Sequence, residues 1–386
     1  MHLSVGIVAG VLLTLTGLTG SMLVFGDEID GLLNPALLQV EPRADRVPLD
    51  TIVSGIHTAF PDRPIDRIHL ASEPGSSLEA CFAEGQEPAC VYADPYTGAQ
   101  LGTRVPARSL KGRVFLFHRR LLSGAVGETI VGIEGALLIV LSASGVMLWM
   151  SGRRPIVRWP SISATTPYAR RHNWHRLVGF TALPLLLLIA TTGMAMVFRP
   201  TFEGTVNRLA SSATPRPPTL SPAASTALPS LDAVLQTVKR TAPDAEPTYV
   251  ILPASPAAPL AVRARMRGEW LPKGRSFVYL DPSTGTIIRI DDARKAAPGY
   301  RAGNVLYPLH VGLLGGWPTR LMHCLVGLAP AFLCWTGTLM AWRRLFPRRG
   351  RAPRRSSAMA AQAPPRPAGE ISASSAPATA VPRRSL

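Results

Sequence analysis

Residues 168–200, YARRHNWHRLVGFTALPLLLLIATTGMAMVFRP, place a basic run and two histidines directly before a long apolar segment. Residues 177–198 carry no charge and are long enough to cross a bilayer as a helix. His172 and His175 lie three positions apart, so both can occupy one side of that helix. A neutral imidazole at the end of a membrane helix is a nitrogen donor in a low-dielectric setting, which suits haem iron or another metal.

Three further apolar stretches have the same character: residues 3–25, about 130–150, and 321–342. A cleaved signal peptide is the alternative for residues 3–25, but no Lys or Arg precedes them and no clear cleavage site follows. The sequence therefore predicts four membrane helices. His2 lies at the mouth of the first span, next to Met1, and the sequence leaves open whether the natural start is Met1 or lies upstream.

The net charge of +17 raises the possibility of nucleic-acid binding, but the location of the charge argues against it. Six arginines and no acid lie between Met150 and Leu177, and ten arginines and one acid follow Trp342. Both runs adjoin apolar spans, as the positive-inside rule requires of cytoplasmic segments. We therefore expect a bacterial inner-membrane protein with both termini in the cytoplasm and both long polar regions in the periplasm.

Each polar region reads as a small α+β unit. A helical pattern at residues 49–60 precedes strand patterns at 65–70, 78–83 and 89–93, and a second helix at 231–241 precedes strands at 249–252, 260–266 and 276–280. Cys81 and Cys90 fall on adjacent predicted strands, where an oxidising compartment would allow a disulfide; two free thiols are the alternative.

The chain is divided as follows: first helix 1–25, polar domain 26–113, amphipathic approach and second helix 114–150, basic loop 151–174, third helix 175–198, polar domain 199–303, approach and fourth helix 304–342, and a basic tail 343–386. The tail is rich in Pro, Ala and Ser, so we expect it to be disordered.

The two halves repeat one another. Three sets of positions align, each at its own constant offset. In the membrane helices, His2, Gly6 and Gly20 align with His175, Gly179 and Gly193, and His118, Gly124 and Gly145 align with His310, Gly316 and Gly337. In the polar regions, Leu49, Asp50, Pro61 and Asp62 align with Leu231, Asp232, Pro243 and Asp244. VYADPYTG from Val91 likewise matches VYLDPSTG from Val278. We infer an internal duplication of helix, α+β domain, helix.

Four of the eight histidines fall in two equivalent pairs, which indicates two b-type haems. His118 and His310 lie at the outer mouths of the second and fourth helices, and His175 and His2 at the inner mouths of the third and first. His172 is the reserve inner ligand. Three arginines beside the ligand candidates could pair with haem propionates: Arg119, Arg120 and Arg176.

Other histidines are weaker candidates. His323 lies just inside the last span and has no histidine at its repeat equivalent, Val131, while His57 and His69 lie in the first outer domain. No GxGxxG motif opens a βαβ unit, and no catalytic triad is evident.

The segments GLTGSMLVFGDEIDGLLNP, NWHRLVGF, YPLHVGLLGGWPTRL and VGLAPAFLCWTGTLMAWRR resemble the PepSY-associated transmembrane helix family, and the two outer units resemble PepSY domains. The resemblance covers residues 1–344. It implies a four-helix membrane bundle with two periplasmic PepSY domains. It matches His175 to the LHR histidine and His310 to the PLHxG histidine of the family, while the usual start before the first helix is reduced here to MHLSVG.

The family includes iron-regulated membrane proteins and haem-containing ferric-siderophore reductases. The resemblance therefore implies an oxidoreductase that takes electrons from a cytoplasmic or quinol donor and delivers them to a ferric siderophore or another ferric chelate outside. The alternative is a non-redox membrane protein whose PepSY domains bind or regulate a periplasmic partner such as a protease or sensor.

Overall fold

The four apolar stretches form long helices in the computed structural model, which describes residues 2–83, 88–150, 166–212, 218–219 and 228–345. Helices α1 (His2–Val24), α6 (Gly124–Met150) and α7 (Pro167–Val197) and the segment Leu313–Trp342 are each long and apolar enough to cross a membrane. Many of their large apolar side chains are exposed, as expected for helices that face lipid. Residues 151–165 of the expected basic loop and 346–386 of the tail lie outside the described residues.

Helix α7 begins earlier than the sequence pattern predicted. The side chain of Thr166 accepts a hydrogen bond from the Ala169 N–H, and Pro167 occupies the first helical position. These are the features that begin a helix. Helix α7 therefore takes in residues 167–174 of the expected loop, and His172 and His175 both lie within the helix rather than at its mouth.

The last span is two helices, α11 (Gly316–Gly327) and α12 (Ala329–Leu345), separated at Leu328. Pro330 explains the break because it lacks an N–H and its ring clashes with the carbonyl four residues earlier. Before α11 come α10 (Pro298–Val311) and the short turn η2 (Leu313–Gly315). Shorter elements flank the other spans: α2 (Gly26–Leu33), α3 (Pro35–Leu38), η1 (Pro106–Arg108), α5 (Leu110–Arg120) and α8 (Arg199–Leu209).

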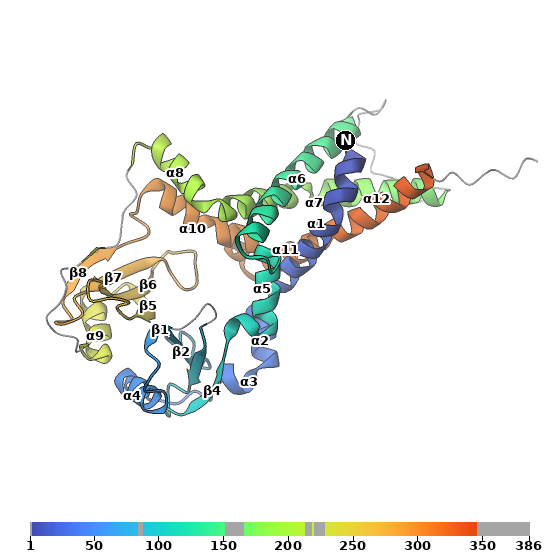
Figure 1. The fold of residues 1–386 in the computed structure, drawn as a ribbon. Helices are drawn as coiled ribbons and strands as arrows, with labels where there is room; N and C mark the ends of the chain where they lie inside the picture. The colour runs from blue at the N-terminus through green and yellow to red at the C-terminus, as the bar shows by residue number, and fades with distance from the viewer. Residues whose placement is uncertain (1, 84–87, 151–165, 213–217, 220–227, 346–386) are drawn as a thin grey trace, which may run out of the picture. The chain divides into compact units, whose positions relative to one another are not determined.

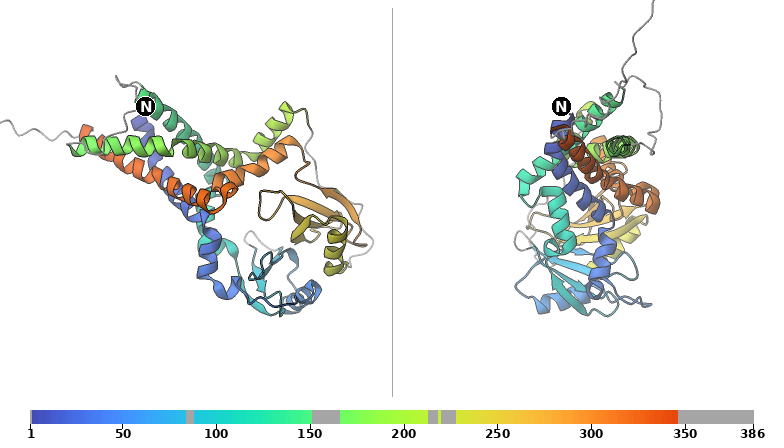
Figure 2. Two further views of the ribbon diagram at one scale, coloured as in Figure 1. Left: turned by 180° about the vertical axis from the view of Figure 1, so that it is seen from behind. Right: turned by 90° about the vertical axis from the view of Figure 1, so that its right-hand side faces the viewer.

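The two polar regions share one antiparallel sheet of eight strands in the order β4-β3-β2-β1-β5-β6-β7-β8 (Figures 1 and 2). The first region supplies β1 (Ile65–His69), β2 (Leu78–Phe82), β3 (Cys90–Ala93) and β4 (Gln100–Arg104). The second supplies β5 (Ala245–Ile251), β6 (Leu260–Met266), β7 (Ser276–Leu280) and β8 (Ile287–Asp291). Strands β4 and β8, which the sequence patterns missed, complete the two hairpins after the DPYTG and DPSTG turns.

One face of the sheet is covered by α4 (Leu49–Ala59) and α9 (Leu231–Thr241). Ile52 and Ile56 of α4, with Val234 and Val238 of α9, join the inward side chains of all six central strands in a single buried core. Because successive strand residues point to opposite faces, the alternate residues of these strands lie on the face that the two helices leave open.

The two four-stranded halves meet where β1 pairs with β5. At the centre of this pairing Ile68 lies opposite Val250, and the sequence offset that aligns Asp50 with Asp232 also aligns these two residues. Arg67 pairs with Ile251 and His69 with Tyr249 on either side. Exchange of the two halves thus maps Ile68 onto its own partner and maps the Arg67–Ile251 pair onto the His69–Tyr249 pair.

Asp50 and Asp232 hold the two helices together by capping each other's helix. Asp232 accepts hydrogen bonds from the N–H groups of Leu49 and Asp50, both at 2.9 Å. Asp50 accepts from the Leu231 N–H at 2.8 Å and from the Ser230 hydroxyl at 2.5 Å. A helix N-terminus has unpaired N–H groups and a partial positive charge, and a carboxylate satisfies both.

We predict that replacing Asp50 or Asp232 by alanine lowers the free energy of unfolding by about 1 kcal/mol each, as for other lost helix caps. Burial acts to raise the pKa of Asp50, but hydrogen bonds from Ser230 and from the Leu231 and Asp232 N–H groups outweigh it, so the pKa lies below 3.8. The capping contribution is therefore fully present above pH ~4 and is lost as the pH falls through the lowered pKa.

Thermal unfolding of the wild type, Asp50→Asn and the exposed-loop control Asp62→Ala between pH 7 and pH 3 measures this contribution. The gap in melting temperature between wild type and Asp50→Asn should shrink towards pH 3, and Asp62→Ala should follow the wild type. A gap that does not change with pH would contradict the assignment.

Candidate functional site

The side chains of His118 and His310, far apart in the sequence, face each other among the helices. Their ring centroids are 6.2 Å apart. His118 lies in the last turn of α5, where its Nδ1 is 3.0 Å from the Thr16 carbonyl oxygen and 3.3 Å from the Thr19 hydroxyl of α1. His310 lies in the last turn of α10, with its Nδ1 3.1 Å from both the Ile189 carbonyl oxygen and the Thr192 hydroxyl of α7.

His2 and His175 form a second facing pair with the same character. Their ring centroids are 6.5 Å apart. The Nδ1 of His2 is 2.8 Å from the Ser144 hydroxyl of α6, and the Nδ1 of His175 is 2.8 Å from the Thr336 hydroxyl of α12. Each ring is thus held by a helix other than its own.

The partners of Nδ1 fix the tautomer of all four imidazoles. A carbonyl oxygen can only accept, so Nδ1 of His118 and of His310 must carry the proton. The Ser144 and Thr336 hydroxyls donate their own protons to carbonyl oxygens of their helices, so they accept from His2 and His175. In a neutral imidazole this leaves the lone pair on Nε2, where a metal ligand needs it. No hydrogen bond to Nε2 of these four rings is found in the described part of the chain.

Glycines make room for the rings. A β-carbon on Gly20 would lie 2.9 Å from Cε1 of His118, and one on Gly193 would lie 3.0 Å from Cε1 of His310. The corresponding distances at the other pair are 3.5 Å from Gly145 to His2 and 3.6 Å from Gly337 to His175. Each of these glycines lies beside a histidine, and the offsets that align the histidines also align Gly20 with Gly193 and Gly145 with Gly337.

The remaining candidates lie elsewhere. His172 stacks on Tyr168 at 6.5 Å rather than joining a pair. His323 is buried with both ring nitrogens on carbonyl oxygens, Nδ1 at 2.8 Å from Thr319 and Nε2 at 3.0 Å from Leu309. It links α11 to α10 and has no nitrogen left for a metal.

The arginines expected near propionates have different surroundings. Arg119 and Arg120 both form ion pairs with Glu128, at 2.9 Å and 3.1 Å. Arg176 follows His175 in α7, and no ion pair to it is found among the described residues.

Sequence analysis missed the groups that orient the rings. The hydroxyls of Thr19 and Thr192 occupy equivalent positions, and so do those of Ser144 and Thr336. The offsets that align the histidines also align these residues, so the repeat itself carried the signal. The contact of Glu134 was also not predicted. This residue is buried in α6, and the Thr16 hydroxyl donates a hydrogen bond to one of its oxygens at 2.5 Å; its other oxygen has no hydrogen-bond partner among the described residues.

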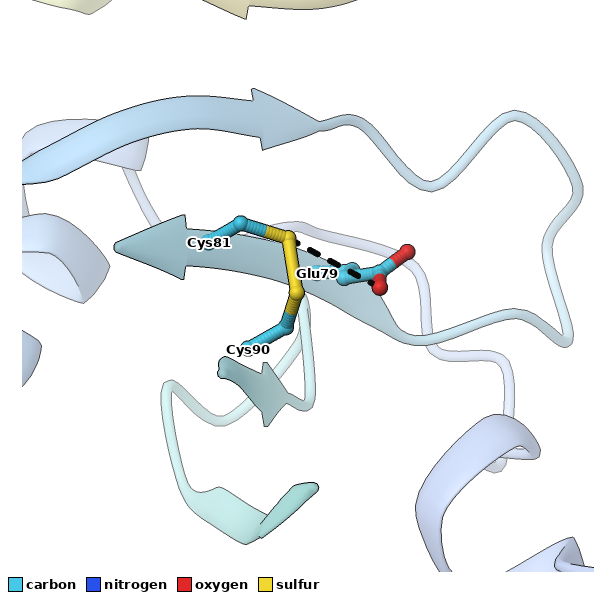
Figure 3. A group of neighbouring side chains, drawn as sticks. All are labelled: Glu79, Cys81 and Cys90. Carbon is cyan, nitrogen blue, oxygen red and sulfur yellow. Dashed lines mark hydrogen bonds between the residues drawn. A yellow bond between two sulfur atoms is a disulfide. The ribbon is translucent and has the colours of Figure 1, made fainter. Parts of the chain in front are cut away.

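The disulfide between Cys81 and Cys90 is present, joining directly paired residues of β2 and β3 (Figure 3). Glu79 lies beside it, with Oε1 3.8 Å from the sulfur of Cys81. A carboxylate and two thiolates could hold a metal ion, but sulfurs bonded to each other are not thiolates. This group is therefore a structural crosslink.

Two comparisons with known proteins bear on this arrangement. The family model described as the PepSY-associated TM region matches residues 1–344, which include both histidine pairs and the whole sheet. No curated protein matches the chain.

Proposed function

Since the chain belongs to the family of the PepSY-associated TM region, we propose that it is a haem-containing reductase of the bacterial inner membrane. It would pass electrons from a cytoplasmic or quinol donor to a ferric siderophore or another ferric chelate in the periplasm. The observation that carries the proposal is the presence of two facing histidine pairs, in each of which Nδ1 donates its proton to a carbonyl or hydroxyl oxygen of another helix.

The spacing of the pairs suits two imidazoles bound on opposite sides of one metal. With metal–nitrogen bonds of about 2.0 Å and each nitrogen about 1.1 Å from its ring centroid, such centroids lie about 6.2 Å apart. The observed separations are 6.2 and 6.5 Å. A single metal ion would satisfy the same spacing, but His–His ligation within a membrane bundle is the pattern expected for b-type haem.

His118 with His310 would hold one haem, and His2 with His175 the other. Haem bound in this way supplies one-electron chemistry. The protein's part is to keep each imidazole neutral and fixed, because a proton on Nδ1 held by a carbonyl or hydroxyl prevents the ring from turning away. Arg176, adjacent to His175, remains available to a propionate, whereas Arg119 and Arg120 would have to share one with Glu128.

We further propose that the chain arose by internal duplication. Residues aligned by constant offsets are Ile68 with Val250 at the centre of the sheet and Asp50 with Asp232 at the helix caps. Ring partners Thr19 and Thr192 follow the same rule. A duplication accounts for two centres of the same construction, one for each pair.

The proposed orientation places both termini of the chain in the cytoplasm and the sheet in the periplasm, following the arginine-rich segments. We predict that alkaline-phosphatase fusions after Asp94 and after Asp281 are both active, since that enzyme requires the periplasm. Fusions placed between residues 151 and 165 should be inactive. An inactive fusion at either sheet position would reverse the proposed direction of electron flow.

The visible spectrum of the purified protein tests the function. We expect two haems per chain, low-spin in both redox states, because a pair of neutral imidazoles gives six-coordinate iron. Ferric chelates should reoxidise the dithionite-reduced protein. If the protein is purified from haem-replete cells without haem, the reductase proposal fails, and a PepSY membrane protein that binds a periplasmic partner replaces it.

A further inference from the structure

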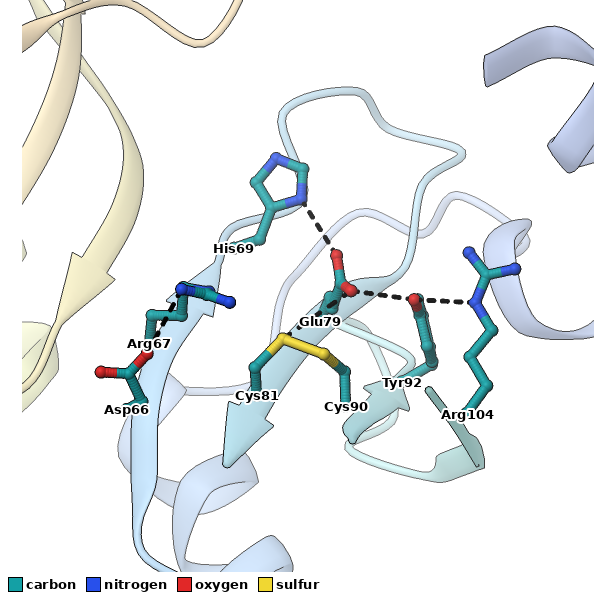
Figure 4. Close-up of a disulfide and its surroundings, with 8 residues drawn as sticks. All are labelled: Asp66, Arg67, His69, Glu79, Cys81, Cys90, Tyr92 and Arg104. Atoms are coloured by element: carbon teal, nitrogen blue, oxygen red, sulfur yellow. Dashed lines mark hydrogen bonds and ion pairs between the residues drawn. A yellow bond between two sulfur atoms is a disulfide. The ribbon is translucent and has the colours of Figure 1, made fainter. Parts of the chain in front are cut away.

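A cavity of about 500 Å³ lies on the open face of the sheet, where the two halves meet. Each half contributes four strand residues to it: Arg67, His69, Cys81 and Cys90 from the first, and Tyr249, Ile251, Arg263 and Phe277 from the second. The rest of the lining is Glu79, Pro88, Pro106 and Ala107. Figure 4 shows the first half's side chains around the disulfide. Small-molecule sites typically measure about 300–1,000 Å³, so this cavity is large enough for one.

The eight strand positions are four equivalent pairs of the repeat, and all four pairs differ in chemistry. Arg67 aligns with Tyr249, His69 with Ile251, Cys81 with Arg263, and Cys90 with Phe277. On the opposite, helix-covered face the aligned pairs are all apolar: Ile68 with Val250, Ala80 with Val262, and Val91 with Val278. Packing against helices explains why the aligned residues on the covered face are all apolar. In the first half, Cys81 and Cys90 form the disulfide and pack against Leu37 and Leu38 of α3, which accounts for two of the four differences. For the two pairs at the junction itself, Arg67 with Tyr249 and His69 with Ile251, an asymmetric occupant would account for the difference.

The second half of the cavity is basic and aromatic around Tyr249. The guanidinium of Arg263 lies 5.3 Å from the Tyr249 ring centroid, and the ammonium of Lys273 donates a hydrogen bond to its hydroxyl at 3.1 Å. His69 stacks on the ring of Tyr249, with the two centroids 4.5 Å apart. Burial lowers the pKa of His69, and Lys273 and Arg263 lower it further, so this imidazole is neutral at pH 7.

The acid in the lining is already engaged within the protein. Glu79 accepts a hydrogen bond from the Tyr92 hydroxyl at 2.9 Å, and its other oxygen lies 3.7 Å from Nδ1 of His69. Burial acts to raise the pKa of Glu79, but these hydrogen bonds outweigh it and keep the carboxylate ionised. Three basic side chains lie nearby. Arg67 is 45% exposed and pairs with Asp66 at 3.3 Å, and Arg263 donates hydrogen bonds to the Gly274 carbonyl at 2.9 and 2.6 Å. With the adjacent Lys273, they give three positive charges against the two carboxylates of Glu79 and Asp66. The cavity therefore favours an anion.

We propose that this cavity binds the substrate as an anionic ferric chelate, with Arg67 and Arg263 contacting its carboxylate or catecholate oxygens and Tyr249 and Phe277 contacting its apolar surface. Arginine suits such oxygens because its planar fork makes charge-assisted hydrogen bonds. The proposal rests on the proposed function and narrows it to anionic chelates at a defined site.

Binding can be measured separately from reduction with gallium(III), which forms chelates like those of iron(III) but is not reduced. Isothermal titration of the full-length protein in detergent would use two probes, an anionic gallium tricatecholate and a gallium trihydroxamate with a positive charge. We expect the wild type to bind the anionic probe, and to bind it more weakly as salt is raised. The double variant Arg67→Ala/Arg263→Ala should bind it at least tenfold more weakly.

Two further variants control for charge and folding. Lys239→Ala/Arg240→Ala removes two exposed charges from α9, on the covered side of the sheet, and should bind as the wild type does. Arg67→Glu changes one half-exposed side chain, so it should fold and still lose affinity. Equal binding of both probes, or undiminished binding in Arg67→Glu, would overturn the site.

The site and the reductase activity fail in different ways. If the protein binds the gallium tricatecholate through these arginines but does not reduce ferric chelates, the proposed site stands and the proposed reductase function fails. If the wild type and Arg67→Glu reduce ferric tricatecholate with the same KM, the proposed function stands and the proposed site fails.

Discussion

Replacing His310 with alanine should remove half of the haem absorbance and stop reduction of ferric chelates. His310 and His118 are the facing pair that we assign to the outer haem, with ring centroids 6.2 Å apart. Without one imidazole, six-coordinate low-spin iron cannot form at that position. The inner pair, His2 and His175, makes its hydrogen bonds to Ser144 and Thr336, away from the altered residue, so it should keep its haem.

The measurement is haem content per chain together with the reduced-minus-oxidised spectrum. His118→Ala should reproduce the result, and His175→Ala should remove the other half of the absorbance. His57→Ala, on the exposed surface of α4, is the matched control and should leave both haems in place. A full low-spin complement in His310→Ala and His118→Ala would show that the ligands are misassigned.

Replacing Gly20 with alanine should have nearly the same effect although it removes no ligand. The added β-carbon would lie 2.9 Å from Cε1 of His118, closer than such atoms approach in proteins. The ring cannot easily move, because its Nδ1 is held by the Thr16 carbonyl and the Thr19 hydroxyl of the same helix. A ring displaced by even part of an ångström cannot keep its distance to a metal that His310 also binds.

We expect Gly20→Ala to lose most of the outer haem, or to convert it to a high-spin form, while the inner haem is unchanged. The control is Gly55→Ala in α4, where a β-carbon meets nothing within 4 Å and alanine favours the helix. Spectra identical for Gly20→Ala and the wild type would show that the described position of His118 is not the ligand-bound one.

Local sequence patterns determined the elements of this protein. Uninterrupted apolar runs predicted the four membrane spans, and period and turn signals predicted α4, α9 and most of the strands. The strands β4 and β8 were missed because they are the two edge strands of the sheet and are half exposed, so neither forms the continuous apolar run of a central strand. The break at Leu328 was missed because hydropathy does not register the single missing N–H of Pro330.

The alignment of the two halves predicted which residues far apart in the sequence belong together, which no pattern within a single segment can do. The alignment of the two halves alone paired His118 with His310 and His2 with His175, since each pair occupies equivalent positions at one constant offset. It also aligned Asp50 with Asp232, but nothing in the alignment indicated that each caps the other's helix.

Only the tertiary structure decided how the two halves join. Whether two four-stranded units remain separate or share a sheet depends on the β1–β5 pairing, whose hydrogen bonds form between residues about half the chain apart. The tautomers of the histidines, the glycines beside them and the cavity over the sheet junction follow from the packing of the folded chain. The sequence by itself determined which residues could act, since residue type and spacing are local properties. The contacts that orient them depend on side chains brought together from separate helices and strands, and these only the folded chain specifies.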